Sequence, residues 1–102
     1  MTTKHNKLVR SKIPQMLKEK KIPYKSHIAS QAEYVEKLYE KLLEEAIELA
    51  KDRNPEELAD VLEVIEAIKV LNGWTTEEIE VIRLKKLADR GGFDQPIILE
   101  ES

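Results

Sequence analysis

The chain of 102 residues contains no cysteine, so disulfide bonds and thiolate metal ligands are excluded. It also has no apolar run approaching the length of a membrane-spanning helix. No signal-peptide pattern opens the sequence, and we therefore expect a soluble, cytoplasmic protein. Internal repeats, low-complexity tracts and long linkers are lacking as well, so residues 1–102 are expected to form one small domain.

Excess positive charge is lacking too, because the net charge is −3, which argues against general affinity for nucleic acid or anionic membranes. Charged residues make up 36% of the chain and hydrophobic residues 41%, and a small helical chain of this kind often completes its core by self-association. The first 27 residues carry many lysines and one acidic residue, Glu19, whereas the middle is strongly acidic. This asymmetry suits a site in which basic groups and a metal share an anionic ligand.

Capping residues predict four helices. They are expected from Ile13 to about Lys20, from a capping box at Ser30–Glu33 toward Asp52, from Pro55 to Asn72, and from Thr75 to Arg90. The tail after Phe93 contains Pro96–Leu99, which predicts either a short strand or an extended arm. The fold class is therefore predicted to be all-α.

Two acidic motifs face each other across the expected turn between the second and third helices. They read Glu44-Glu45-Ala46-Ile47-Glu48 and Glu57-Leu58-Ala59-Asp60, and residues three apart lie on one face of a helix. At a rise of about 1.5 Å per residue, Glu45 and Glu48 come level with Asp60 and Glu57 when the hairpin folds back. Four carboxylates meeting in this way repel one another unless a cation lies among them.

Each of these acids taken alone is also consistent with solvated surface. Glu57 is in addition the third residue of its helix, where its carboxylate could cap backbone only. If the four acids do converge, a shell of carboxylates without histidine or cysteine suits a hard ion such as Mg²⁺ or Mn²⁺. Carboxylate-bound Mg²⁺ usually takes further ligands from substrate phosphates, which predicts phosphate chemistry.

Basic side chains are the candidate phosphate ligands. Lys7, Arg10 and Lys12 form a cluster with no neighbouring acid in the sequence, and arginine suits bidentate phosphate contact. Arg90, before a Gly-Gly turn, and Lys86, one turn earlier on the same face, are candidates for a second clamp. The alternatives are solvated lysines, an arginine paired with a nearby helix, and an Arg90 that only complements the helix dipole.

Histidines and aromatic residues give weaker signals. His5 and His27 lie far from the acidic motifs in sequence and are interpreted as surface or packing residues. Aromatic side chains at helix ends more often seal a core or a subunit interface than stack on a base, and this applies to Tyr34, Tyr39, Trp74 and Phe93.

The order Glu44-Glu45-x-x-Glu48 then Glu57-x-x-Asp60 resembles the signature of the all-α nucleotide pyrophosphohydrolases of the MazG type, which include phosphoribosyl-ATP pyrophosphohydrolase and helical dUTPase/dCTPase enzymes. The opening Asn6–Pro14 and the closing Arg90–Phe93 are similar to those of a small MazG-like subgroup described as house-cleaning nucleoside triphosphate pyrophosphatases. Ser11 stands where that subgroup usually has an acid, and no role is assigned to it. Only eight residues separate the two motifs, which demands a tight hairpin.

The resemblance implies Mg²⁺-dependent hydrolysis of a nucleoside triphosphate, standard or non-canonical, to the monophosphate and pyrophosphate. Carried over by position, the metal ligands would be Glu45, Glu48, Glu57 and Asp60. Glu44 would assist Glu45 in catalysis, as a further ligand or as the group that orients the attacking water. The outgoing pyrophosphate would be held by Lys7, Arg10 and Lys12.

We expect a MazG-like homodimer or higher homo-oligomer in which the second and third helices of two chains form a four-helix core, since a lone hairpin could not cover faces this apolar. Two alternatives stay open. One is phosphoribosyl-ATP hydrolysis, which uses the same cut on a different substrate, and the other is a non-catalytic helical interaction module.

Overall fold

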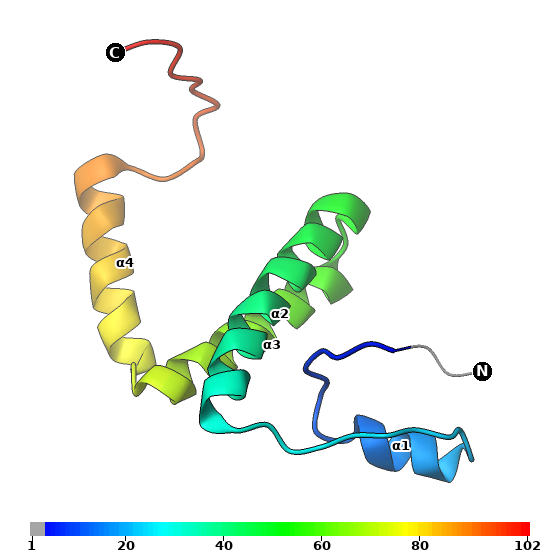
Figure 1. Ribbon diagram of the computed structural model, residues 1–102. Helices are drawn as coiled ribbons and strands as arrows, with labels where there is room; N and C mark the ends of the chain where they lie inside the picture. The colour runs from blue at the N-terminus through cyan, green and yellow to red at the C-terminus, as the bar shows by residue number, and fades with distance from the viewer. Residues whose placement is uncertain (1–3) are drawn as a thin grey trace.

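The computed structural model describes residues 4–102, and within them it contains four helices and no strand (Figure 1). The helices are α1 (Ile13–Glu19), α2 (Gln31–Asp52), α3 (Pro55–Asn72) and α4 (Thr76–Arg90). The predicted all-α class is thereby confirmed, and the tail beyond α4 is an arm without regular secondary structure rather than a strand. No helix in residues 4–102 is both long enough and apolar enough to cross a membrane.

Polar side chains fix where α3 and α4 begin. Asn54 Oδ1 accepts a hydrogen bond of 2.9 Å from the backbone N–H of Glu57, and Pro55 occupies the first turn, where its missing N–H is no loss. At α4, Thr75 and Glu78 form a complete capping box, with bonds of 3.1 Å and 2.9 Å. Hydrogen bonds between residues three positions apart therefore set where α3 and α4 begin.

The capping box predicted at the start of α2 is only half formed. Ser30 Oγ accepts from the N–H of Glu33 at 3.2 Å, but the Glu33 carboxylate does not return to the backbone of Ser30. Glu33 Oε1 instead contacts His27 Nε2 at 2.8 Å. The preceding extended segment supplies this competing partner, which the four-residue pattern alone could not reveal.

A two-residue connection, Arg53-Asn54, turns α2 into α3. Arg53 adopts the left-handed conformation with φ 50°, and its backbone N–H donates to Leu49 O at 2.9 Å. Its side chain also donates from Nε to Ala50 O at 2.9 Å, which satisfies a further carbonyl at the end of α2. The tight hairpin that the short spacing demands is thus closed by one residue in an uncommon conformation.

The hydrophobic core lies between α2 and α3 and is small. Leu38, Val64 and Ile68 are buried, and the partly buried residues packed against them are Leu8, Tyr34, Leu42, Ala67 and Leu71. Leu8 brings the N-terminal segment against the hairpin. The core positions this segment beside the two acidic motifs.

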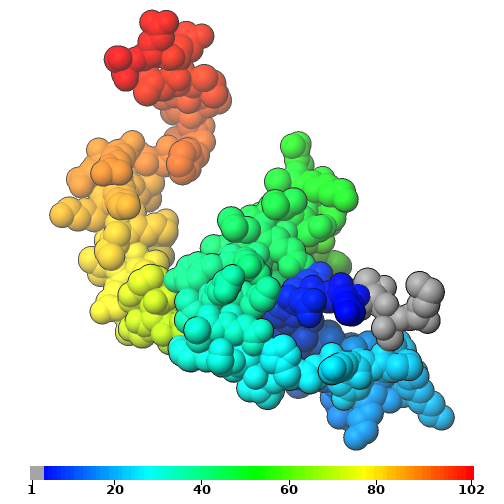
Figure 2. Space-filling view, viewed as in Figure 1, coloured from blue at the N-terminus to red at the C-terminus, as the bar shows by residue number. Residues whose placement is uncertain are grey.

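α4 and the arm extend away from the hairpin (Figures 1 and 2). Among the described residues, α2 and α3 form the only helix pair with extensive contact. The radius of gyration is 18.0 Å, against about 13 Å expected for a compact domain of this length. The accessible surface is 9460 Å², against about 5,900 Å² for a compact chain of 11.8 kDa. A single copy therefore leaves roughly 3,500 Å² more surface in water than a compact domain would.

One side of the hairpin carries an exposed apolar surface, which we call the hairpin face. At about 100° per residue, its members turn away from the buried stripes of α2 and α3, and they emerge on the same side because the two helices are antiparallel. The hairpin face consists of Tyr39, Leu43 and Ile47 on α2 and Leu58, Leu62 and Ile65 on α3. Leu43 and Ile47 are each 65% exposed, so this surface is available to a partner.

Candidate metal centre

Carboxylate oxygens from α2 and α3 come together beside the hairpin turn in two overlapping groups. The first group is Glu45, Glu57 and Asp60, and the second is Glu48, Asp52 and Glu57. Within each group, one oxygen from each residue lies within 4.8 Å of the others. Three of the four sequence-predicted ligands form the first group, and the fourth, Glu48, lies in the second group with Asp52 and the shared Glu57. We call these five residues the acidic corner.

Asp52 is a member that the sequence interpretation missed. The capping pattern uses Asp52 only to mark the end of the second helix, yet Asp52 lies four residues after Glu48 on α2. Residues four apart share a helical face, so this spacing is the signal that could have identified it. The acidic corner therefore reaches the last residue of α2.

Glu57 belongs to both carboxylate groups, and its carboxylate is free to do so because it takes no part in capping α3. Asn54 alone caps α3, so Glu57 contributes only its backbone N–H to the cap. The alternative in which this carboxylate serves the backbone is not what the structure shows. Loss of hydration, reinforced by the negative charges of Asp52 and Asp60, raises the pKa of Glu57 above its ordinary value of 4.5.

Two basic side chains of the N-terminal segment form ion pairs with the acidic motifs, one with each motif. Lys7 Nζ lies 2.9 Å from Glu44 Oε1, and Arg10 Nη2 lies 2.7 Å from Asp60 Oδ1. The hydrogen bond and charge of Glu44 raise the pKa of Lys7, and Lys7 in turn lowers the pKa of Glu44. For Arg10 the structure shows the pairing with a nearby helix that was one of the alternatives. Two of the three residues of the predicted basic cluster, Lys7 and Arg10, therefore pair with acids of their own chain.

Glu44 itself stays outside the two carboxylate groups. It is held between Lys7 and Lys41, the latter with Nζ at 3.4 Å from Glu44 Oε1 and 3.5 Å from Glu45 Oε1. This places Glu44 next to Glu45 but with its charge already balanced.

The remaining candidate phosphate ligands are not brought to the acidic corner of their own chain. Within residues 4–102, no ion pair or side-chain hydrogen bond involves Lys12, Lys86 or Arg90. Lys12 precedes α1, and its side chain caps nothing. Lys86 and Arg90 lie on α4, which leaves the hairpin at the end remote from the turn (Figure 1).

The aromatic side chains are spread over the chain rather than gathered at the acidic corner. Tyr34 packs against the core, and Tyr39 Oη accepts a hydrogen bond of 3.1 Å from Asn72 Nδ2. Trp74 lies at the α3–α4 junction, half exposed, and Phe93 projects fully into solvent from the arm. His27 is exposed and pairs with Glu33, as expected of a surface histidine.

The donor chemistry of the acidic corner fits a hard divalent ion. All the ligand atoms offered are carboxylate oxygens, which Mg²⁺ and Mn²⁺ prefer. Oxygens around one octahedral Mg²⁺ lie about 2.9–4.2 Å apart, given metal–oxygen bonds of about 2.0–2.1 Å. A separation of up to 4.8 Å between carboxylate oxygens is therefore close to the range that an octahedral ion requires.

Similarity to characterised proteins does not assign this centre. Comparison of the chain with models of protein families, with curated proteins and with solved structures finds no match. Its chemistry is therefore inferred from the residues themselves: five carboxylates at a hairpin turn, with Lys7 and Arg10 laid across the neighbouring helices.

Proposed function

We propose that the protein is a Mg²⁺-dependent nucleoside triphosphate pyrophosphohydrolase, with Mn²⁺ as an alternative ion. The observation that carries this proposal is the acidic corner with two cations of the N-terminal segment beside it. Carboxylates suit a hard ion, and an ion with adjacent Lys and Arg side chains suits the phosphates of a nucleotide. The resemblance of both acidic motifs to those of MazG-type enzymes supports the same reaction, the cut between the α- and β-phosphates of a standard or non-canonical nucleotide.

In this proposal the acidic residues keep the roles that the resemblance implies, and their positions support those roles. Glu45, Glu48, Glu57 and Asp60 hold the ion, and Asp52 adds an oxygen at the turn. When bound, the ion neutralises charge on the phosphate oxygens and lowers the pKa of a bound water. Glu44, adjacent to Glu45 and held by Lys41 when Lys7 turns to the substrate, orients the attacking water.

The two N-terminal cations are available to substrate because their present ion pairs are weak. The side chains of Arg10 and Asp60 are 57% and 40% exposed, and an exposed pair of this kind contributes about 0–1 kcal/mol. Exchanging Asp60 for a phosphate therefore costs Arg10 little. Lys7 can exchange Glu44 for phosphate on the same grounds, and Lys12 follows on the same segment.

A homodimer completes the fold in this proposal. The hairpin faces of two copies pair to give a four-helix core from α2 and α3 of each chain. A stable interface usually covers about 800 Å² per partner, and the excess surface of roughly 3,500 Å² is ample for that. Isologous pairing would bury Leu43 and Ile47, the most exposed members of the hairpin face.

The decisive experiment is a pyrophosphate-release assay across a panel of nucleoside triphosphates and phosphoribosyl-ATP, with and without Mg²⁺. We expect Mg²⁺-dependent turnover of one or more triphosphates, and loss of turnover in Glu48→Gln and Asp60→Asn with the helical content unchanged. Glu63→Gln is the matched control, because Glu63 is an exposed acid of α3 outside the acidic corner.

Each other result of this assay would indicate a different function. Turnover of phosphoribosyl-ATP alone would assign the same site to that substrate. Wild-type rates in both corner variants would remove the acidic corner from catalysis. No turnover of any nucleotide, together with no effect of Mg²⁺ on thermal stability, would identify a helical interaction module.

A further inference from the structure

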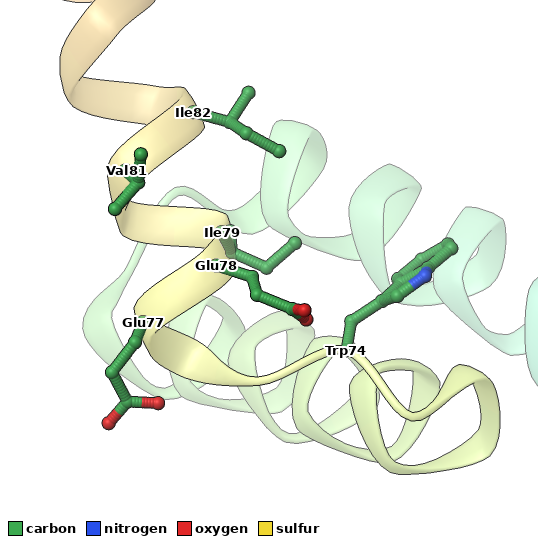
Figure 3. A pocket seen from close by; sticks show the side chains of 6 residues that line it. All are labelled: Trp74, Glu77, Glu78, Ile79, Val81 and Ile82. Atoms are coloured by element: carbon green, nitrogen blue, oxygen red, sulfur yellow. The ribbon is translucent and has the colours of Figure 1, made fainter.

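One stripe of α4 changes from apolar to basic along its length. At about 100° per residue, Ile79, Ile82, Lys86 and Arg90 share a face of this helix. Figure 3 shows Ile79 and Ile82 pointing to the same side of α4 as Trp74, while Val81 points away. An open hollow at the start of α4 is lined by Trp74, Glu77, Glu78, Ile79, Val81 and Ile82. We call the four residues Ile79, Ile82, Lys86 and Arg90 the α4 stripe.

Hydrogen bonds within the chain connect the start of α4 to α3 and order the junction between the two helices. Lys69 Nζ donates to Thr76 Oγ1 at 2.7 Å, which joins the last turn of α3 to the first turn of α4. The capping box of Thr75 and Glu78 further orders the junction. Gly73, with φ 68°, provides the left-handed residue that ends α3. The start of α4 is thus ordered, and all four residues of the α4 stripe are exposed, with Ile79 at 37% and Ile82 at 54%.

Charge complementarity and the large exposed surface both favour a second copy of this chain as the partner. The acidic corner holds five carboxylates, and only Arg10 and Lys41 form ion pairs with its members among the described residues. Within residues 4–102, no ion pair involves Lys86 or Arg90, so the positive charge at this end of the α4 stripe complements the acidic corner. The excess surface of roughly 3,500 Å² exceeds the usual 800 Å² per partner several-fold, which leaves room for more than the hairpin face.

We propose that the α4 stripe of one copy docks on the hairpin of a second copy, and that its Lys86 and Arg90 bind the phosphates of the substrate held at that copy's acidic corner. Ile79 and Ile82 supply the apolar contact, and the twofold relation repeats the exchange in the other direction. Each site is then built from two chains. The identity of the bound group as a nucleotide phosphate rests on the proposed function, but the docking does not.

Crosslinking tests the docking without any assay of activity. The chain has no cysteine, so two single substitutions, Lys86→Cys and Asp52→Cys, can be placed on chains of different mass and mixed. We expect a short bifunctional thiol reagent to join the two kinds of chain efficiently. Lys85→Cys is the matched control, because its side chain lies about 100° further round α4. Equal crosslinking of Lys85→Cys and Lys86→Cys, or a monomer in sedimentation, would overturn the docking.

Complementation tests the role of the basic residues. Arg90→Gln and Glu48→Gln are each expected to lower turnover strongly as homodimers, whereas Arg90→Lys should retain part of it. Mixed and reassembled, the two defective chains should recover about one quarter of wild-type turnover, since half of the dimers are mixed and each mixed dimer has one intact site. Active wild type without recovery would overturn the shared site alone. An inactive wild type whose chains still crosslink as expected would instead overturn the proposed function and leave the docking standing.

Discussion

Mg²⁺ is expected to stabilise the wild-type protein and to lose this effect in Glu57→Gln. Glu57 belongs to both carboxylate groups, and its pKa is raised because its carboxylate loses hydration and faces Asp52 and Asp60. In the metal-free protein, ionising this carboxylate therefore costs more free energy than ionising an isolated glutamate. A divalent ion relieves that repulsion, and it can bind the folded corner but has no equivalent site in the unfolded chain.

The expected magnitude follows from linkage. At a free Mg²⁺ concentration ten times the dissociation constant, binding to the folded state adds about 1.4 kcal/mol to the free energy of unfolding. For a domain of about 100 residues this raises the melting temperature by roughly 6–11 °C. Metal-free Glu57→Gln should melt at or above the wild-type temperature, since the substitution removes a repelling charge, and Mg²⁺ should no longer shift it.

Thermal melts followed by circular dichroism over a Mg²⁺ titration provide the measurement. Ionic strength is held constant with NaCl because screening alone weakens carboxylate repulsion, and protein concentration is fixed because assembly also stabilises. Glu63→Gln, an exposed acid on the same helix, should respond as the wild type does. The reasoning fails if the wild type does not respond to Mg²⁺, or if Glu57→Gln is stabilised as much as the wild type.

Two further predictions concern stability. Lys7→Gln should make the free energy of unfolding fall less steeply as the pH drops below neutral. Lys7 is the main cause of the lowered folded-state pKa of Glu44, which lies below the ordinary value of 4.5. The Glu44 carboxylate therefore stabilises the fold above pH 4.5, and this effect is lost as the pH falls through the lowered pKa. Urea unfolding from neutral to acidic pH measures this, and equal slopes in both proteins would contradict it. Leu38→Ala should lower the free energy of unfolding by about 2–5 kcal/mol, since Leu38 is 2% exposed in a core this small. Ile28→Ala, at a position 97% exposed, is the control, and a similar loss in both variants would show that the hairpin core is not the stabilising unit.

Helix boundaries were predictable because the residues that set them act locally. Asn54 and Pro55 start α3, Thr75 and Glu78 start α4, and Gly73 ends α3, as the capping pattern indicated. The meeting of α2 and α3 acids beside the turn followed from helix rise and a short connection. In each case the interacting groups lie within a few residues or at positions that helix geometry relates directly.

Features that depend on tertiary neighbours were not predictable in the same way. The Glu33 carboxylate pairs with His27 from a preceding extended segment, which no helix rule places. The contact of Arg10 with Asp60 joins residues fifty positions apart, and sequence alone left this pairing as one alternative among several. The arrangement of Lys86 and Arg90 depends on the direction of α4, which the chain's own core does not determine.

The α3–α4 junction holds the one tryptophan of the chain, Trp74, with its side chain 48% exposed beside the hollow at the start of α4. Its indole is therefore a native fluorophore placed where two copies would meet. Covering it would move its emission to shorter wavelength, so a simple dilution series in a fluorimeter would report subunit dissociation on unlabelled material. Because no second indole contributes, any spectral change could be assigned to this single position.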